Sequence, residues 1–333
     1  MTAPLWTPST DRASKSNMAR FISKLEADWG VSLPDYEAAH EFSVNEMEKF
    51  WDSFWTFADI RAEQRGETVL VDGDRMPGAR FFPDARLNFA ENLLRRRDDT
   101  EALVFWAEDQ VKRRMSWKEL YDLVSRLSQA LRDQGVAAGD RVAGFVPNMP
   151  ETIAAMLATA SIGAIWTSCS PDFGIQGVLD RFGQSEPKVL FTADGYYYNG
   201  KSHDSLHRVK EIVSELPSVE KIVVLPLVDA EPEVDELLTA ETLYQFIGDF
   251  DAGEIEFAQL PFNHPLYIMY SSGTTWVPKC IVHGAGGTLI NQMKEHILHC
   301  DARPGARVFY FTTCGWMMWN WLVAGLAAEA MLM

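Results

Sequence analysis

The hydrophobic and polar positions of the chain change their period near residue 100. Before this point, apolar residues recur at helical spacing: Met47, Phe50, Trp51, Phe54 and Phe57 fall on one face of a helix. After it, short apolar runs alternate with helical stretches of about a dozen residues. Because parallel strands must be joined through crossovers, this pattern predicts an α/β fold with a largely parallel sheet and flanking helices, preceded by a helical N-terminal segment.

Two of the predicted helices carry their own boundary signals. Ser116 and Glu119 have the spacing of a capping box, and Gly135 marks the end of that helix. Pro150 stands in the first turn of the next helix, which ends at Gly163. The predicted strands are ALVFW (102–106), DRVAGFV (140–146), AIWTSCS (164–170), KVLFTADG (188–195), KIVVLPL (221–227) and LYIMY (266–270), and a further helix lies in HDSLHRVKEIVSEL (203–216).

These elements predict three parts of the chain. Residues 1–85 form an aromatic-rich helical segment, 86–227 a first α/β subdomain, and 228–333 a second α/β subdomain. Acidic VDAEPEVDELLTAET (228–242) is predicted to be the linker between the last two. HGAGGTL (283–289) is interpreted as a turn that leads into the helix TLINQMKEHILH (288–299).

The almost unbroken apolar run at residues 316–333 could be mistaken for a membrane-spanning helix. It contains Asn320 and Glu329 and has no basic residues beside it. These features favour a buried helix followed by the start of a strand.

The charge of the chain limits its partners. With 30 Lys and Arg against 47 Asp and Glu, the formal net charge is −17, which argues against nucleic acid or an anionic membrane as the main partner. Cys169, Cys280, Cys300 and Cys314 contain no CxxC pair, and the N-terminus lacks the apolar core of a secretory signal. We therefore expect a cytoplasmic protein without disulfides.

The stretch YIMYSSGTTWVPKCIVHG (267–284) carries the candidate chemistry. A predicted strand runs straight into a loop of hydroxyl residues, a glycine and a lysine, which are the donors that a polyphosphate needs. It is not a Walker A loop, because Pro278 precedes the lysine and Cys280 follows it. The candidate nucleotide-binding residues are Ser271, Ser272, Gly273, Thr274, Thr275 and Lys279.

This loop resembles the phosphate-binding signature of adenylate-forming enzymes, the superfamily of acyl-CoA synthetases, luciferases and adenylation domains. Trp276 is the departure from that signature, which takes Gly or Ser at this place. The wording of LNFAENLL (87–94), SPDFG (170–174), EPKVLFTADGYYYNGK (186–201) and TTCGWMMWNWLVAGLA (312–327) is similar to the acetoacetate-CoA ligase branch in particular.

The resemblance implies an ATP-dependent activation of acetoacetate to acetoacetyl-CoA through an acyl-adenylate, with ATP, Mg²⁺ and coenzyme A as cofactors. It implies catalytic roles for Thr274 and Lys279 and phosphate contacts by the rest of the loop. Four further residues fall where the family places its substrate pocket, although a packed helix start and a satisfied buried histidine are open alternatives. They are His283, Trp316, Met317 and Trp319.

Other candidates for chemistry are less specific. His296, His299 and Cys300 share a predicted helix, but no carboxylate completes a ligand set, so we predict no protein-ligated metal. The basic runs at 95–97 and 112–114 are interpreted as solvated faces, with contact to the phosphates of coenzyme A as an open alternative.

Chains of the family are about twice this length. The elements that the resemblance implies for adenine, ribose, Mg²⁺ and the α-phosphate are not among these 333 residues, so we expect the N-terminal portion of such an enzyme. An alternative is a catalytically incompetent fragment that acts at most as a weak nucleotide-binding module. Trp276 is expected to weaken ATP binding, because it lacks the positive φ and close approach that glycine permits.

Overall fold

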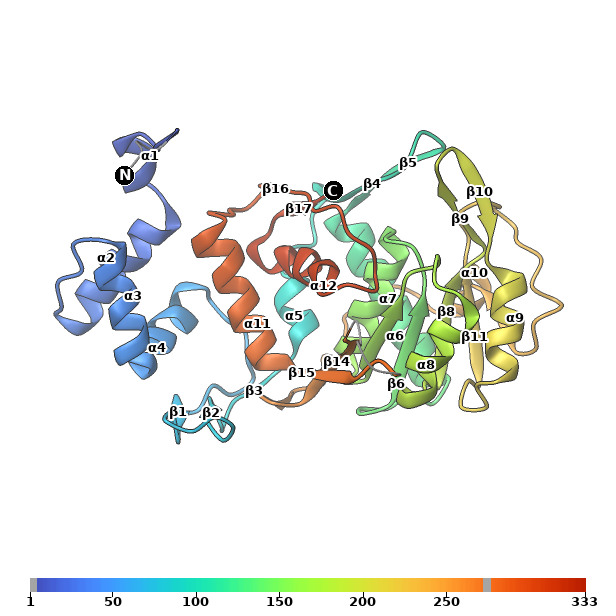
Figure 1. Ribbon diagram of the computed structural model, residues 1–333, viewed down its shortest axis with the longest axis horizontal. Helices are drawn as coiled ribbons and strands as arrows, with labels where there is room; N and C mark the ends of the chain where they lie inside the picture. The colour runs from blue at the N-terminus through green and yellow to red at the C-terminus, as the bar shows by residue number, and fades with distance from the viewer. Residues whose placement is uncertain (1–4, 272–276) are drawn as a thin grey trace.

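The computed structural model describes residues 5–271 and 277–333. Its helices and strands have the alternation expected of an α/β protein, with the N-terminal helices at one end and strands β9 and β10 near the opposite end (Figure 1). Within the described ranges, no helix is long and apolar enough to cross a membrane. Cys169 and Cys314 are buried free thiols, and Cys280 and Cys300 are exposed ones.

The N-terminal segment is helical because aromatic side chains hold its helices together. The ring of Phe21 lies 5.4 Å from that of Phe50, 5.6 Å from that of Phe54 and 5.1 Å from that of Phe57. Such edge-to-face and tilted pairs add to the burial of apolar area. The amphipathic helix predicted around Phe54 is confirmed. The helices of this segment are α1 (Thr10–Ser14), α2 (Asn17–Trp29), α3 (Tyr36–Asn45) and α4 (Met47–Phe57).

The centre of the molecule is a seven-stranded sheet with the order β12-β11-β8-β6-β7-β14-β15. All neighbouring strands are parallel except β14 and β15, which are antiparallel. The largely parallel sheet predicted from the alternation is confirmed. The strands are β6 (Arg141–Phe145), β7 (Ile165–Cys169), β8 (Val189–Ala193), β11 (Lys221–Leu225), β12 (Ala240–Thr242), β14 (Pro265–Tyr270) and β15 (Cys280–Gly284).

Helices cover both faces of this sheet. In β8, Val189 and Phe191 join the larger core and Leu190 the smaller one, because alternate side chains of a strand point to opposite faces. The larger core includes α6 and α7, and the smaller includes α8 and α9. Every residue of α7 is buried. The helices here are α5 (Phe89–Leu93), α6 (Trp117–Asp133), α7 (Pro150–Ser161), α8 (Ile175–Ser185), α9 (Leu206–Ser214) and α10 (Leu243–Phe246).

The predicted helix boundaries agree with their local signals. Ser116 caps α6 as its side chain accepts from the backbone of Glu119, whose carboxylate accepts from the backbone of Ser116. Gly135, just beyond α6, has a φ of 80°, which glycine adopts without strain.

The apolar run at the end of the sequence is a buried helix followed by a strand, as predicted. It forms α12 (Met317–Ala324), a short 3₁₀ turn η2 (Gly325–Ala328) and β17 (Met331–Leu332). Strand β17 lies in a second sheet of order β16-β17-β4-β5. The remaining strands of this sheet are β4 (Glu101–Ala107), β5 (Val111–Ser116) and β16 (Arg307–Val308).

Three small antiparallel strand pairs complete the fold. One of them, β3 with β13, joins the N-terminal third of the chain to the segment before β14. The pairs are β1 (Leu70–Val71) with β2 (Arg80–Phe81), β3 (Arg86–Leu87) with β13 (Leu260–Pro261), and β9 (Gly195–Tyr198) with β10 (Lys201–Asp204).

The acidic stretch 228–242 is largely exposed, as expected of a linker, but it is also packed against the main sheet. Val234 and Leu237 are buried against the smaller core, and β12 pairs with β11 at the edge of the main sheet. Strands before and after this stretch lie in the same sheet. How the chain divides into independent folding units stays a prediction.

The glycine-rich turn predicted before residue 288 is part of a helix. Helix α11 (Ala285–Lys294) begins at Ala285, so Gly286 and Gly287 lie in its first turn, and a π-helical turn η1 (Glu295–His299) follows. A Cβ added at Gly286 would come within 2.2 Å of the Phe262 ring, whereas one at Gly287 would meet nothing within 4 Å. Gly286 is therefore required for the close packing of α11 on Phe262.

These two adjacent glycines give a matched test of that packing. We expect Gly286→Ala to lower the free energy of unfolding by about 1–3 kcal/mol, because the buried ring must move to make room. Gly287→Ala should raise it by roughly 0.5–1 kcal/mol, since alanine lowers the entropy of the unfolded chain. Urea unfolding followed by circular dichroism measures both. Equal stability of the two variants would contradict the assignment.

Candidate functional site

The candidate phosphate loop lies where the main sheet changes strand direction. In parallel α/β sheets, ligands bind outside the carboxyl ends of the strands. Ser271 follows directly after β14, and the chain returns through β15, with Tyr270 opposite Cys280 in the register. The loop between the two strands therefore starts at the carboxyl end of a parallel strand, beside the end of β7.

Two hydrogen bonds close the base of this loop. The backbone N–H of Ser271 donates to the carbonyl of Lys279 at 3.0 Å, and the backbone N–H of Lys279 donates to Ser271 Oγ at 3.0 Å. The Ser271 hydroxyl acts as an acceptor in this pair, and no described residue accepts the proton of this hydroxyl.

Helix α8 supports the returning arm of the loop. Gln184 Nε2 donates to the carbonyl of Pro278 at 2.8 Å, and the Cys280 thiol donates to Gln184 Oε1 at 3.7 Å. Beneath the loop, the hydroxyl of Tyr270 donates to Ser185 Oγ at 3.2 Å. Burial raises the pKa of Tyr270, so the phenol stays neutral and serves as a structural anchor. No sequence pattern predicted this role of Gln184, because its partner is a backbone carbonyl far along the chain.

The described part of the loop fits an anionic ligand. Lys279 is exposed and forms no ion pair with any described residue, so its ammonium can meet phosphate oxygens without first breaking a salt bridge. Of the other predicted phosphate ligands, Ser271 is described. Ser272, Gly273, Thr274 and Thr275, and the unusual Trp276, lie outside the described residues.

His283 lies on β15, on the side of the loop that returns to the helix α11. Its ring centroid is 5.0 Å from that of Tyr267, whose hydroxyl accepts from Gln292 Nε2 at 3.2 Å. Burial lowers the pKa of His283, which keeps the imidazole neutral near pH 7. A contact between His283 and a nucleotide stays a prediction.

The three predicted pocket residues of the segment 316–319 divide into two groups. Trp316 is 60% exposed and Met317 is 45% exposed, whereas Trp319 is fully buried. Trp319 Nε1 donates to Asn148 Oδ1 at 2.9 Å, and its ring lies 6.5 Å from that of Trp166. Its burial favours the packed-helix alternative for Trp319, while Trp316 and Met317 remain available to a ligand.

Strand β7 ties this segment to the edge of the sheet. Ser168 Oγ donates to the carbonyl of Cys314 at 2.7 Å and accepts from Trp166 Nε1 at 3.2 Å. The next residue, Gly315, lies against the backbone of Ser170, where an added Cβ would be 3.5 Å from the amide nitrogen. The start of α12 is therefore held at the carboxyl edge of the sheet, near the end of β14.

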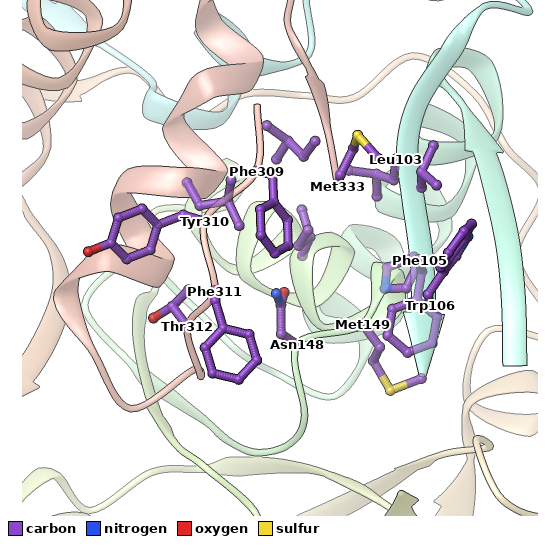
Figure 2. A pocket seen from close by; sticks show the side chains of 15 residues that line it. Leu103, Phe105, Trp106, Asn148, Met149, Phe309, Tyr310, Phe311, Thr312 and Met333 are labelled. Atoms are coloured by element: carbon purple, nitrogen blue, oxygen red, sulfur yellow. The ribbon is translucent and has the colours of Figure 1, made fainter. Parts of the chain in front are cut away.

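An apolar groove of about 220 Å³ lies on the other side of α12. Figure 2 shows Phe309 and Phe311 on one side of it, Trp106 and Met149 on the other, and Asn148 between them. No acidic or basic side chain of the described residues lines the groove. It offers a mainly apolar, aromatic surface, and no pattern in the sequence predicted it.

The histidines and cysteine considered as metal ligands do not converge. His296 is buried, stacks on Trp321 at 4.2 Å, and donates from Nε2 to the carbonyl of Trp321 at 2.7 Å. His299 and Cys300 are exposed. Within the part of the chain that the structure describes, no three His, Cys, Asp or Glu residues are placed to hold a metal ion.

The residues of the two basic runs differ in exposure: Arg97, Lys112 and Arg114 are exposed, as predicted, whereas Arg95 is not. The side chain of Arg95 is only 7% exposed and donates to the carbonyls of Ala58 at 3.3 Å, Asp59 at 2.7 Å and Asn92 at 2.9 Å. The prediction of a solvated face is wrong for this residue, because the carbonyls at the end of α4 provide its partners. Arg113 forms a bidentate pair with the buried Glu151 at 2.7 and 2.9 Å.

Comparison with known proteins defines the class. A family model described as "AMP-binding enzyme" matches residues 89–331, and one described as "Acetyl-coenzyme A synthetase N-terminus" matches residues 36–93. The chain belongs to the AMP-binding enzyme family, and the resemblance to adenylate-forming enzymes is confirmed.

The individual relatives that match the chain are CoA synthetases. The chain is 56% identical over 330 residues to the acetoacetyl-coenzyme A synthetase of Rhizobium meliloti (strain 1021), which covers 99% of this chain and 50% of that protein. It is 40% identical over 342 residues to a malonamoyl-CoA synthetase of Penicillium aethiopicum, covering 98% of this chain and 47% of that protein. The chain spans about half the length of the curated relatives it matches.

A solved structure has the same fold as this chain. The acetoacetyl-CoA synthetase from Streptomyces lividans superposes with a TM-score of 0.93 at 41% identity, covering 99% of this chain and 51% of that one. The described chain thus has the fold of the N-terminal portion of an adenylate-forming enzyme.

The buried His296 makes the free energy of unfolding depend on pH. Burial is the main cause that lowers its pKa below 6.5, so the unfolded chain takes up this proton first as the pH falls. The contribution of His296 to the free energy of unfolding should therefore fall below about pH 6.5, by at most about 1.4 kcal/mol per pH unit, and level off below the folded pKa. Above pH 6.5 it should have no slope.

Urea unfolding from pH 5 to pH 8 measures this slope, and His296→Phe, which retains an aromatic ring beside Trp321, should remove its share. A nuclear magnetic resonance titration in which His296 is protonated at or above pH 6.5 would contradict the assignment.

Proposed function

We propose that this chain carries the ATP-binding part of a cytoplasmic acid–thiol ligase that activates acetoacetate to acetoacetyl-CoA. The observation that supports this most is the loop at the carboxyl end of β14, closed at its base by Ser271 and Lys279, in a chain that belongs to the AMP-binding enzyme family. Relatives named as acetoacetyl-CoA synthetases match nearly all of the chain.

The proposed reaction has two steps. A carboxylate oxygen of acetoacetate bonds to the α-phosphorus of ATP, and the bond to pyrophosphate breaks. The thiol sulfur of coenzyme A then bonds to the acyl carbon, its proton is lost to solvent, and AMP leaves. Both reactants of the first step are anions, so positioning and neutralisation of charge govern its rate.

The loop residues supply the positioning. Lys279 would place its ammonium on the β- and γ-phosphates, and the Ser271 hydroxyl would donate its free proton. Ser272, Gly273, Thr274 and Thr275 would add hydroxyl and backbone donors. Mg²⁺, when bound with ATP, supplies further charge neutralisation and takes most of its ligands from phosphates and water.

The acyl group is proposed from the relatives. Acetoacetyl and malonamoyl groups, which stand in the names of the relatives, both carry a carbonyl at the third carbon. We therefore propose a short acid with a 3-carbonyl group as the substrate class, with Trp316 and Met317 at the mouth of its pocket.

A second function is ATP binding without turnover. This chain matches 50% of a curated relative, and the family resemblance implies further residues for adenine, ribose and the α-phosphate that are not among the residues named above. These 333 residues could hold the polyphosphate of a nucleotide through the loop and leave the chemistry undone.

One set of measurements separates these functions. Titration calorimetry measures ATP binding, and a coupled assay measures pyrophosphate released with ATP, Mg²⁺ and acetoacetate. Lys279→Ala should weaken ATP binding about 10- to 100-fold, because a hydrogen bond to a charged group contributes roughly 1.5–3 kcal/mol. Lys118→Ala removes an exposed lysine of α6 that pairs with Asp122, and should change nothing.

The outcomes are distinct. Acetoacetate-dependent pyrophosphate release supports the ligase, and ATP binding without release supports the second function. A chain that binds no ATP, or binds it equally well as Lys279→Ala, contradicts both.

Trp276 allows a test of the loop itself. Trp276→Gly should tighten ATP binding and raise any pyrophosphate release, because glycine permits positive φ and a close approach of the backbone to phosphate. Trp276→Phe, which keeps a bulky ring, should behave like the wild type. If Trp276→Gly binds ATP no more tightly than Trp276→Phe, the loop tolerates the indole.

A further inference from the structure

Three arginines line a surface cavity of about 270 Å³ beside the N-terminal helices. At about 30 Å³ of liquid volume for each water molecule, this space is equivalent to roughly nine waters, which is the size of a small organic ligand. Its walls come from α2, the end of α4, η1 with the loop that follows it, and η2. The residues described for β14, β15 and the phosphate loop do not line it, so it is separate from the candidate site. Its charged lining residues are Arg20, Arg95, Arg303 and Glu329.

Arg95 is the buried charge of this cavity. Its side chain is 7% exposed, and its guanidinium donates mainly to backbone carbonyls. In the described ranges, the carboxylate within ion-pair distance is that of Asp59, 3.7 Å away on a side chain that is 88% exposed. Burial, followed by the neighbouring charge of Arg61, lowers the pKa of Arg95. The positive charge of Arg95 is therefore poorly compensated.

Two other charges of the lining already have partners. Arg303 lies 3.2 Å from a carboxylate oxygen of Asp301. Glu329 lies 3.9 Å from Nε of Arg96, outside the cavity. Because each of these charges is offset by its neighbour, the two pairs add little net charge to the cavity.

Arg20 is the second arginine that lacks a carboxylate. It forms no ion pair with any residue of the described ranges. Its Nη1 donates to Asn17 Oδ1 at 3.2 Å, and its guanidinium lies 5.8 Å from the centre of the Phe57 ring. These contacts orient the guanidinium but use few of its N–H donors. Arg20 and Arg95 thus make the cavity locally positive in a chain whose net charge is −17.

Hydrogen bonds fix the walls of the cavity before any ligand binds. The backbone N–H of Asn17 donates to Asp301 Oδ1 at 2.7 Å, and Asn17 Nδ2 donates to the carbonyl of Ala302 at 3.0 Å. Arg303 donates to the carbonyl of Lys15 at 2.6 Å. These bonds fasten the start of α2 to the loop after η1. A preformed cavity lowers the cost of ordering the protein around a ligand.

We propose that this cavity binds a short organic monocarboxylate, with the carboxylate at Arg20 and Arg95 and the carbon chain on the apolar wall. Guanidinium groups match the geometry of a carboxylate. Glu329 also lines the cavity and repels a second negative charge, which disfavours a phosphate dianion. The apolar wall includes Phe57, Ile297 and the alanines of η2, which suit an alkyl chain better than a bare inorganic ion.

Hexanoate is the probe for this site, because its carboxylate and alkyl chain match the two parts of the cavity. Titration calorimetry on the full 333-residue chain measures the dissociation constants of hexanoate, 1-hexanol and inorganic phosphate. Hexanoate should bind at least about 10-fold more tightly than either, because hexanol lacks the charge and phosphate lacks the alkyl chain. The titrations contain neither ATP nor coenzyme A, so their outcome does not depend on the proposed ligase reaction.

Substitutions assign the binding to the arginines. Arg20→Gln should weaken hexanoate binding about 10-fold, the low end for a lost charge-assisted hydrogen bond, because solvent screens this exposed side chain. Arg20→Lys keeps the charge and should lose less. Arg307→Gln is the matched control, since Arg307 is also an exposed arginine but does not line the cavity. Thermal unfolding without hexanoate verifies that the variants are folded.

The outcomes separate the proposal from its alternatives. Hexanoate that binds no more tightly than hexanol, or that binds Arg20→Gln as tightly as the wild type, overturns the proposal. Phosphate that binds more tightly than hexanoate overturns the assignment of a monocarboxylate. An equal loss of affinity in Arg307→Gln and Arg20→Gln reveals a general effect of charge and overturns the assignment of this cavity.

Discussion

The common direction of six neighbouring strands is the constraint on which the rest of this structure depends. Parallel strands must be joined through crossovers, and the helices that provide them bury both faces of the sheet, so that α7 has no exposed residue. The same direction brings the carboxyl ends of β7 and β14 to one edge. Ser168 and Tyr270, which are about a hundred positions apart in sequence, line the same cavity there because of strand direction and not because of any local signal.

The elements that local physics determines were predictable from the sequence. The capping box of Ser116 and Glu119 and the alternation of apolar runs indicate α6 and the strands directly, because the interactions involve neighbours in the chain. The prediction was wrong where a partner lies far away. The acidic composition of 228–242 does not reveal that Val234 and Leu237 are buried against helices that precede them. Arg95 likewise finds its partners at the end of α4, which a run of basic residues does not reveal.

The candidate site was also predictable only in part. The order of small and hydroxyl residues indicates the loop, because a phosphate cradle is built from consecutive backbone and side-chain donors. The loop's hydrogen bonds with Gln184 depend on how α8 packs, and the sequence contains no trace of them. Trp316 and Trp319 are the same residue type three positions apart, but Trp316 is exposed and Trp319 is buried as α12 begins.

Strand β15 has a consequence for the behaviour of the protein in solution. It lies at the end of the main sheet, and the adjacent side chains Ile281 and Val282 are 48% and 56% exposed, although they point to opposite faces. An open edge with apolar residues on both faces is a template on which another strand can add. At neutral pH the net charge of −17 makes two copies repel each other. Acidification protonates the carboxylates and weakens that repulsion, so colloidal stability in this protein depends on its acidic surface to protect the strand that carries the phosphate loop.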